Sequence, residues 1–227
     1  MPVYQIPDEH LIFPHPSEAN PDGLLGIGAD LKPNRLLLAY QNGIFPWYSA
    51  GEPIHWWCLT PRLILYPSKI RISKSMRQYL NGLKFQFSYD KDFLSVMLQC
   101  KSVSRKDQRG SWIHQDILDA FIELHRLGIA HSVEVWEDKK LVGGLYGLGI
   151  GKMFCGESMF ANKPNASKFA LIQLADLLIQ KDYHFIDCQQ DTPHLKSMGA
   201  ELVEKNVFFK MLEENKKYSI HSESWKN

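Results

Sequence analysis

The spacing of apolar residues changes repeatedly between positions 130 and 190, and this pattern limits the chain to folds that combine a sheet with helices. Residues 133–136 and 141–148 have the pattern of strands, and the polar turn at 137–140 joins them as a hairpin. A strand is predicted at 152–160, a helix at 165–180 and a strand at 184–189. Antiparallel strands that lead into a strand–helix–strand unit predict a mixed-sheet α/β (or α+β) fold.

The first 60 residues have a different character, because they are rich in turns and aromatic side chains. One short helix is predicted there, with Pro33 in its first turn and Gly43 just past its end. We expect a small N-terminal domain over residues 1–60, a boundary near Thr60, and a larger domain over residues 61–227.

The remaining elements of the larger domain follow from local signals. Ser73 is the predicted N-cap of a helix, and Gly128 is the predicted stop of another. We expect strands at 63–65, 85–88 and 207–212, helices after Ser73 and at 91–99 and 115–127, a basic loop at 101–110, and a frayed polar tail from Glu213.

Charge is strongly segregated along a chain whose net charge is only +1. Residues 61–110 hold 11 basic and 3 acidic side chains, a net charge of +8. Such a block can bind a polyanion locally, although a solvated basic face without a partner is an equally open interpretation.

Several classes of protein are disfavoured. The chain has no run of 18 apolar residues, and its first ten residues lack the basic and apolar regions of a signal peptide. We therefore expect a cytoplasmic protein. The four cysteines form no Cys-x-x-Cys pair, and the histidines form no helical His-x-x-x-His pair, so neither a disulfide framework nor a metal site is expected.

Three polar residues stand out near the ends of predicted strands. On a strand Glu157 shares one face with Met153, Cys155 and Met159, and a carboxylate among apolar neighbours is costly unless it is paired or binds a cation. Asp187 and Gln189 are two apart, which predicts that they lie side by side on one strand face. Such a pair can hold an amine and a carbonyl together. The structural alternatives are an ion pair for Glu157 and a strand-end capping network for Asp187 and Gln189.

Glycines and tryptophans supply two further candidate features. The glycine-rich residues 143–152 have neither the Gly-x-Gly-x-x-Gly nor the Gly-x4-Gly-Lys-Ser/Thr spacing of nucleotide loops, so we interpret them as sites of close backbone approach. Tryptophans near the basic block are candidate platforms for stacking a base, although burial in the core is the commoner role. They are Trp47, Trp56, Trp57 and Trp112.

These segments together resemble the leucyl/phenylalanyl-tRNA–protein transferases from about residue 13 to residue 202. The matching segments are 20–30 (NPDGLLGIGAD), 43–47 (GIFPW), 56–57 (WW), 111–113 (SWI), 131–136 (HSVEVW), 141–144 (LVGG), 154–160 (FCGESMF), 165–168 (NASK) and 186–189 (IDCQ). The resemblance implies an N-acetyltransferase-like (acyl-CoA N-acyltransferase) domain beside a small N-terminal domain. It also implies transfer of Leu or Phe, and Met less efficiently, from aminoacyl-tRNA to proteins with N-terminal Arg or Lys. This modification belongs to the N-degron (N-end rule) pathway of protein degradation.

The resemblance also implies roles for individual residues. Asp187 and Gln189 would lie at the reacting amine and carbonyl. We assign Asp187 to polarising the amine or orienting Gln189, and Glu157 to attracting the cationic end of the acceptor. An apolar pocket for the donor's side chain would consist of Leu145, Phe154, Met159, Leu174 and Ile186. Trp47 and Trp112 would hold the terminal adenosine, and the tRNA phosphates would meet Lys74, Arg77, Arg105, Lys106 and Arg109. We expect no cofactor or metal, a monomer, and no membrane partner.

Two alternatives use some of the same features. A CoA-dependent N-acetyltransferase usually needs a glycine-rich pyrophosphate loop after the site strand, and residues 160–166 contain no glycine. A non-catalytic RNA-binding module would use the tryptophans and the basic block but would leave Glu157, Asp187 and Gln189 unexplained.

Overall fold

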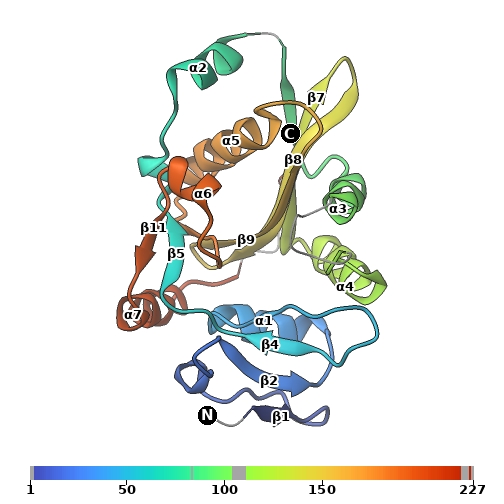
Figure 1. Cartoon of the computed structure of the whole chain (residues 1–227), viewed down its shortest axis with the longest axis vertical. Coiled ribbons are helices and arrows are strands. Elements are labelled where there is room, and N and C mark those ends of the chain that lie inside the picture. The colour runs from blue at the N-terminus through green and yellow to red at the C-terminus, as the bar shows by residue number, and fades with distance from the viewer. Residues whose placement is uncertain (1–2, 83, 104–110, 221–224, 226–227) are drawn as a thin grey trace.

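A computed structural model of the chain describes residues 3–82, 84–103, 111–220 and 225. It contains a four-stranded sheet in the order β1-β2-β4-β3 and a seven-stranded sheet in the order β11-β5-β10-β9-β8-β7-β6. Figure 1 shows the smaller, N-terminal sheet at one end of the molecule, with α1 (Pro33–Gln41) between it and the larger sheet. The strands of the small sheet are β1 (Tyr4–Ile6), β2 (Leu24–Gly28), β3 (Phe45–Pro46) and β4 (His55–Trp57).

The larger sheet confirms the mixed α/β class predicted from sequence. In the described chain its neighbouring strands pair antiparallel except β9 and β10, which are parallel and are connected through α5 (Ala166–Gln180). This is the expected strand–helix–strand unit. The strands are β5 (Arg62–Leu65), β6 (Gln86–Tyr89), β7 (Ala130–Glu137), β8 (Lys140–Ile150), β9 (Met153–Ala161), β10 (Phe185–Asp187) and β11 (Glu201–Val203).

Helices cover both faces of this sheet, with α3 and α4 on one face and α5 and α6 on the other (Figure 1). We call the face covered by α3 and α4 the near face and the face covered by α5 and α6 the far face. A first apolar core joins α1 and the small sheet to α3, α4 and the near face of the large sheet. A second core lies between the far face and α5. The remaining helices are α2 (Lys74–Asn81), α3 (Phe93–Ser102), α4 (Gln115–Arg126), α6 (Pro193–Ser197) and α7 (Lys205–Asn215). No helix in the described part of the chain combines the length and apolar character needed to cross a bilayer.

Local capping signals were reliable guides to helix ends. The Ser73 side chain accepts a hydrogen bond from the Met76 N–H at the start of α2, as expected of an N-cap. Gly43 and Gly128 follow α1 and α4 with φ of 71° and 73°, a backbone conformation that favours glycine.

The predictions for the C-terminal region were wrong. Residues 207–212 are helical rather than a strand, because Phe208 and Leu212 lie one turn apart on the buried face of α7. That face packs against Gly43, where an added Cβ would lie 2.7 Å from the Phe208 ring. The tail is also not simply frayed, since Asn215 is buried and hydrogen-bonds both the Ile150 carbonyl and the Lys152 N–H at 2.8 Å.

Candidate active site

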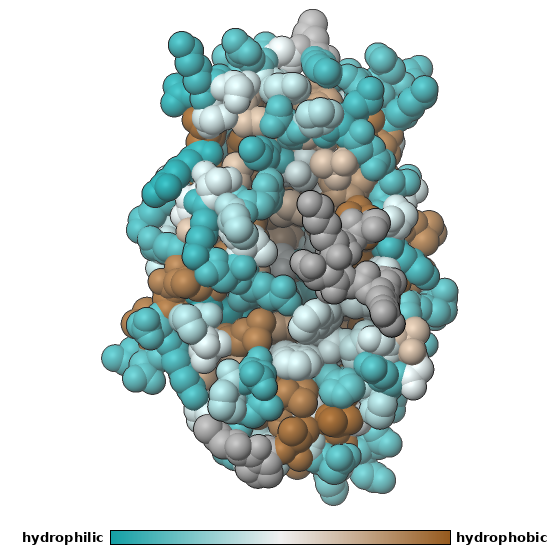
Figure 2. Space-filling view, viewed as in Figure 1, coloured by the Kyte–Doolittle hydropathy of each residue, from teal (hydrophilic) through white to brown (hydrophobic). Residues whose placement is uncertain are grey.

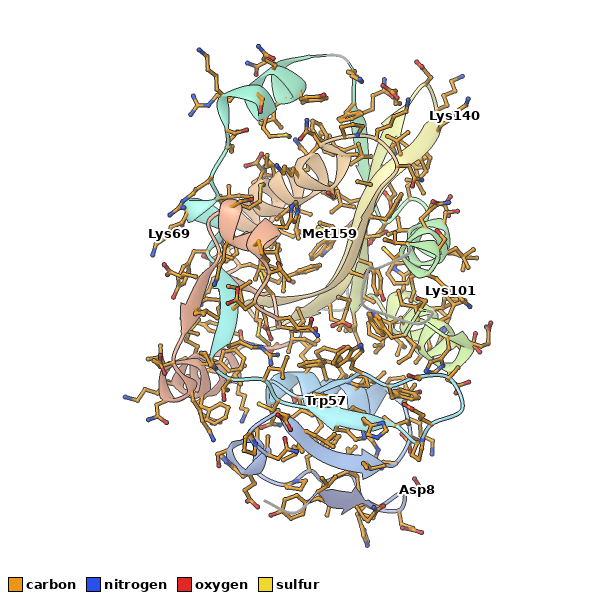
Figure 3. The ribbon with its side chains drawn as sticks, in the orientation of Figure 1. Asp8, Trp57, Lys69, Lys101, Lys140 and Met159 are labelled. Atoms are coloured by element: carbon orange, nitrogen blue, oxygen red, sulfur yellow. The ribbon has the colours of Figure 1, made fainter. Side chains whose placement is uncertain are left out.

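A cavity of about 680 Å³ opens between the far face of the sheet, helices α5 and α6, and the end of β3. In Figure 3, Met159 of β9 lies between the sheet and these two helices. The cavity brings together most of the site residues predicted from sequence, although they come from six separate segments: Trp47, Trp112, Leu145, Phe154, Glu157, Met159, Leu174, Ile186 and Gln189.

Three predicted basic or acidic residues of the described chain lie elsewhere. Lys74 and Arg77 are exposed on α2, where Figure 2 shows a mainly hydrophilic surface at one end of the molecule. Asp187 does not line the cavity, and its side chain is only 1% exposed. Arg105, Lys106 and Arg109 lie outside the described residues.

A β-bulge in β9 places Glu157 in the cavity. Tyr146 of β8 pairs with Ser158 whereas the next residue, Gly147, pairs with Gly156, so Glu157 has no direct partner in the ladder. The extra residue interrupts the alternation of side chains along β9. Met153 and Cys155 therefore pack in the first core, while Met159 packs in the second. The expectation that all four residues share one face was wrong for this reason.

Gln189 forms the other half of the polar centre, but it is not beside Asp187 on a strand. Strand β10 ends at Asp187, and Gln189 follows with a φ of 58° in the left-handed region. This turn directs the Gln189 side chain towards β9, where Nε2 donates a hydrogen bond of 2.7 Å to Glu157 Oε1. The predicted side-by-side arrangement was wrong, yet the turn still brings Gln189 to the cavity.

Behind this pair, Asp187 is held by a buried ion pair. Arg62 Nε and Nη2 donate to the two carboxylate oxygens at 2.7 and 2.8 Å, and both side chains are 1% exposed. Asp187 Oδ1 also accepts the backbone N–H of Gln189 at 3.0 Å. Asp187 therefore contacts the polar centre through the backbone of Gln189, which agrees with an orienting role and not with direct contact at the cavity surface.

Arg62 was missed as a site residue, because in the sequence it is one of eleven basic residues in the +8 block. Its guanidinium lies 5.1 Å from the Phe45 ring centre and 4.9 Å from that of Phe208. Burial opposes the charge of Arg62, but the Asp187 carboxylate more than offsets this effect and raises the pKa of the guanidinium. The one available signal was its position at the start of an apolar strand.

The electrostatics of Glu157 depend on a second residue that sequence reasoning missed, Tyr40 of α1. Burial of the Glu157 carboxyl raises its pKa to about 8, and the neighbouring Tyr40 hydroxyl and Gln189 amide oppose that rise. The side chain keeps part of its surface open to the cavity. A cation that enters the cavity would favour the ionised carboxylate, so the group can respond to a charged ligand.

The tryptophans divide into two kinds. Trp47 and Trp112 are partly exposed at the cavity, and Trp57 supports the first of them by donating a 2.6 Å hydrogen bond to the Trp47 carbonyl. Trp56 is completely buried, with its Nε1 bonded to the Gly28 carbonyl at 2.8 Å and its ring against Phe13. Its interpretation as a stacking platform was wrong.

Comparison with known proteins gives a consistent result. The sequence profile described as "Leucyl/phenylalanyl-tRNA protein transferase" matches residues 64–213, and the profile of its N-terminal domain matches residues 29–64. A leucyl/phenylalanyl-tRNA–protein transferase from Maridesulfovibrio salexigens is 46% identical over 226 residues, covering 99% of this chain and 94% of that protein. One from Flavobacterium johnsoniae is 48% identical over 202 residues, covering 89% of this chain and 95% of that protein.

The chain belongs to the leucyl/phenylalanyl-tRNA–protein transferase family. Membership makes it an aminoacyltransferase, and this confirms the enzyme class indicated by the sequence motifs.

Solved structures add less than the family match. A conserved protein of unknown function from Bacteroides thetaiotaomicron aligns with a TM-score of 0.45 and 16% identity, covering 62% of this chain and 58% of that one. A likeness at this level carries no argument about the fold family or the site. The chemistry of this transferase family member must therefore be argued from its own cavity.

Proposed function

We propose that the protein transfers leucine or phenylalanine, and methionine less efficiently, from aminoacyl-tRNA to the N-terminal Arg or Lys of acceptor proteins in the N-degron pathway. The observation that carries this proposal is a single cavity with two unlike halves. One half is apolar, and the other presents the hydrogen-bonded pair Glu157 and Gln189.

The apolar half suits the side chain of the donor amino acid. Leu145, Leu174 and Ile186 are almost fully buried at its wall, with Phe154 beside them. Met159 adds a flexible thioether, which suits a pocket that accepts both branched and aromatic groups. In this proposal Trp47 and Trp112 hold the terminal adenosine by stacking. Lys74, Arg77, Arg105, Lys106 and Arg109 meet the phosphates.

The polar half suits the acceptor amine. The donor is an activated ester, so the enzyme must chiefly bring an amine to its carbonyl, and positioning alone can lower such a barrier by several kcal/mol. Since Gln189 donates through Nε2 to Glu157, its Oε1 is the atom that can accept a hydrogen bond from the amine. Asp187 fixes the backbone of Gln189, and Glu157 attracts the cationic end of the acceptor.

No strong base is required for this reaction. An α-amino group has a pKa of about 7.7–8.0 and is partly neutral near pH 7. Burial raises the pKa of the Cys188 thiol at the cavity wall, which keeps the thiol protonated and favours direct transfer over a thioester intermediate. Residues of this chain thus supply orientation and charge, and we propose that the reaction needs neither cofactor nor metal.

The organisation of the chain is part of the proposal. We propose a small N-terminal domain over residues 1–60 and an N-acetyltransferase-like domain over residues 61–227, in a cytoplasmic monomer. Two sheets with separate strand orders support this division, whereas the first core passes continuously from one to the other. The two domains therefore share packing even though their sheets are distinct.

Family membership favours transfer over the two alternatives, CoA-dependent acetylation and RNA binding without catalysis. The direct test measures transfer of radiolabelled leucine and phenylalanine from their tRNAs to a peptide beginning with Arg and a peptide beginning with Ala, without CoA or metal. We expect label on the Arg peptide alone. Labelling of neither peptide, with a known transferase active in parallel, would overturn the proposal.

Glu157→Gln tests the acceptor half of the site separately. The substitution keeps the shape of the side chain but removes the charge, and charged hydrogen bonds contribute about 1.5–3 kcal/mol. We expect KM for the Arg peptide to rise about ten- to hundredfold, with the affinity for aminoacyl-tRNA unchanged. Equal weakening of both substrates would remove Glu157 from the acceptor role.

A further inference from the structure

One buried aromatic residue outside the cavity has no role in the function described so far. Trp225 is 4% exposed and belongs to the second core, the same cluster that contains Phe154, Leu174 and Ile186 of the cavity wall. It lies 71 positions beyond Phe154 in the sequence, so its contact with the pocket wall depends on the fold rather than on a local motif.

The backbone of Trp225 is fixed by a buried carboxylate. Its N–H donates to Asp90 Oδ2 at 2.9 Å, and the same carboxylate accepts the Ser132 N–H at 2.9 Å and lies 2.9 Å from His131 Nδ1. Although burial disfavours ionisation of Asp90, the hydrogen bonds that it receives hold its pKa below the ordinary value. Asp90 is therefore an anionic anchor at the end of β6.

The indole ring of Trp225 is fixed as well. It stacks on the His131 ring with centres 3.8 Å apart and planes within 1°, and the Tyr183 ring meets it edge-on at 6.0 Å. A buried side chain with defined neighbours of this kind occupies one rotamer, so it restricts the positions of the side chains that pack against it.

The contact that matters for the site is the one with Phe154. The two ring centres are 5.7 Å apart, and Phe154 also lies against Gly147 of β8, where an added Cβ would be 2.6 Å from the ring. Phe154 thus has a fixed partner in Trp225 and another in the backbone of β8. Its ring forms part of the wall that would meet the donor's side chain.

We propose that Trp225 is a positioning residue for the donor's amino acid: by fixing Phe154 it sets the depth of the apolar half of the cavity, and thereby the discrimination between leucyl and phenylalanyl donors. This inference rests on the proposed transfer function. A smaller side chain at position 225 would leave a void into which Phe154 can move, because cores relax partly towards new cavities. The pocket would then deepen and suit the larger donor better.

The test compares kcat/KM for Phe-tRNA and Leu-tRNA in the full-length protein, with an Arg peptide as acceptor. Pockets discriminate one methylene by about 10- to 200-fold, so we expect Trp225→Ala to move the phenylalanine-to-leucine ratio about tenfold towards phenylalanine, mainly through KM for the donor. Trp225→Phe should move it in the same direction by about threefold. KM for the Arg peptide should stay unchanged in both variants.

Met76→Ala is the matched control, since Met76 is 1% exposed in the same core but does not line the cavity. It should lower the thermal midpoint without moving the donor ratio. An additional cycle combines Trp225→Ala with Phe154→Ala, and we expect the effect of the first substitution to vanish once Phe154 is absent.

Two results would overturn the inference: a donor ratio that is unchanged in Trp225→Ala, or effects of Trp225 and Phe154 that simply multiply. Trp225→Phe decides the matter if the alanine variant does not fold, and an unchanged ratio in that variant is equally negative. Failure of the transfer proposal is distinguishable, because it would show as a wild-type protein that transfers neither amino acid.

Discussion

The two halves of the cavity are built in different ways. The apolar half uses side chains from β8, β9, α5 and β10, and all but Met159, which follows the bulge in β9, point in directions set by ordinary strand and helix periodicity. The polar half depends on a bulge at Glu157, a left-handed turn at Gln189 and an ion pair between residues 125 positions apart. The comparison indicates that substitutions in the apolar half should change transfer by small, graded amounts. A single substitution in the polar half should instead cause a large loss of transfer.

The largest expected effect comes from breaking the ion pair behind the polar half. Arg62→Met leaves the Asp187 carboxylate buried without its partner, which costs about 3–5 kcal/mol of stability in comparable pairs. We expect a loss of this size in denaturant unfolding, and a fall in transfer of at least about a hundredfold because Arg62 no longer fixes the carboxylate that accepts the Gln189 N–H.

A double variant separates stability from positioning. Arg62→Met combined with Asp187→Leu replaces the pair with apolar groups and should recover much of the lost stability, as such replacements often do. Transfer should remain low in the double variant, because no carboxylate is left to hold the Gln189 N–H. Full recovery of transfer would show that the ion pair serves folding alone.

The next effect concerns the pH dependence of stability through Glu157. Its pKa is raised from an ordinary 4.5 to about 8 in the folded protein, so the folded state binds a proton that the unfolded state releases between these values. The wild type should therefore lose stability as pH rises from about 4.5 to 8, relative to Glu157→Gln. At about 1.4 kcal/mol per pKa unit the full shift would correspond to about 5 kcal/mol, and because the side chain keeps part of its surface open to the cavity we expect a smaller difference, on the order of 3 kcal/mol.

Chemical denaturation of both proteins at several pH values measures this difference. The glutamine variant is the appropriate reference, because it keeps the hydrogen bond from Gln189 and every other titrating group. Parallel stability curves for the two proteins would contradict the raised pKa of Glu157.

Changes in the apolar half should be smaller and graded. Leu145 and Leu174 lie at the wall of the apolar half. Leu174→Phe adds volume at a wall residue that is 1% exposed, and we expect phenylalanine transfer to fall about tenfold relative to leucine transfer. Leu145→Met nearly conserves volume and should change the ratio less than about threefold. Competition assays with both aminoacyl-tRNAs give these ratios directly, and abrupt loss of all transfer in either variant would contradict the comparison.

The same contrast explains what could be predicted from the sequence. Strand alternation and helical periodicity identified the strand–helix–strand unit, and the family resemblance pointed to the five apolar wall residues that the cavity brings together. Alternation failed at Glu157, because a bulge depends on pairing with β8 and leaves no local signal. Arg62 and Tyr40 were missed because their partners lie far away in the sequence, at Asp187 and Glu157.

The α7 error has a related origin. Residues 207–212 contain the apolar run Val-Phe-Phe, which is as compatible with a strand as with a helix. Its helical state follows from the packing of Phe208 and Leu212 against Gly43, a contact with the turn after α1, which is far away in the sequence. Such contacts decide whether a short apolar run forms a strand or a helix, and periodicity alone does not predict these contacts.

The smallest expected effects lie outside the cavity, at the exposed residues Lys74 and Arg77. A side chain that only neutralises a phosphate should act independently of the site's geometry. Replacing both with Gln should weaken aminoacyl-tRNA binding by about two- to fivefold each and reduce the slope of log affinity against log salt by about one per lost contact. Filter binding across a range of salt concentrations measures both quantities.

Lys216 and Lys217 are the matched control, because each already pairs with a glutamate of α7. An equal reduction of the slope by replacement of the control pair would show that tRNA affinity depends only on the overall charge of the protein. A reduction confined to the α2 variant would place a phosphate contact on α2 and extend the binding surface beyond the cavity.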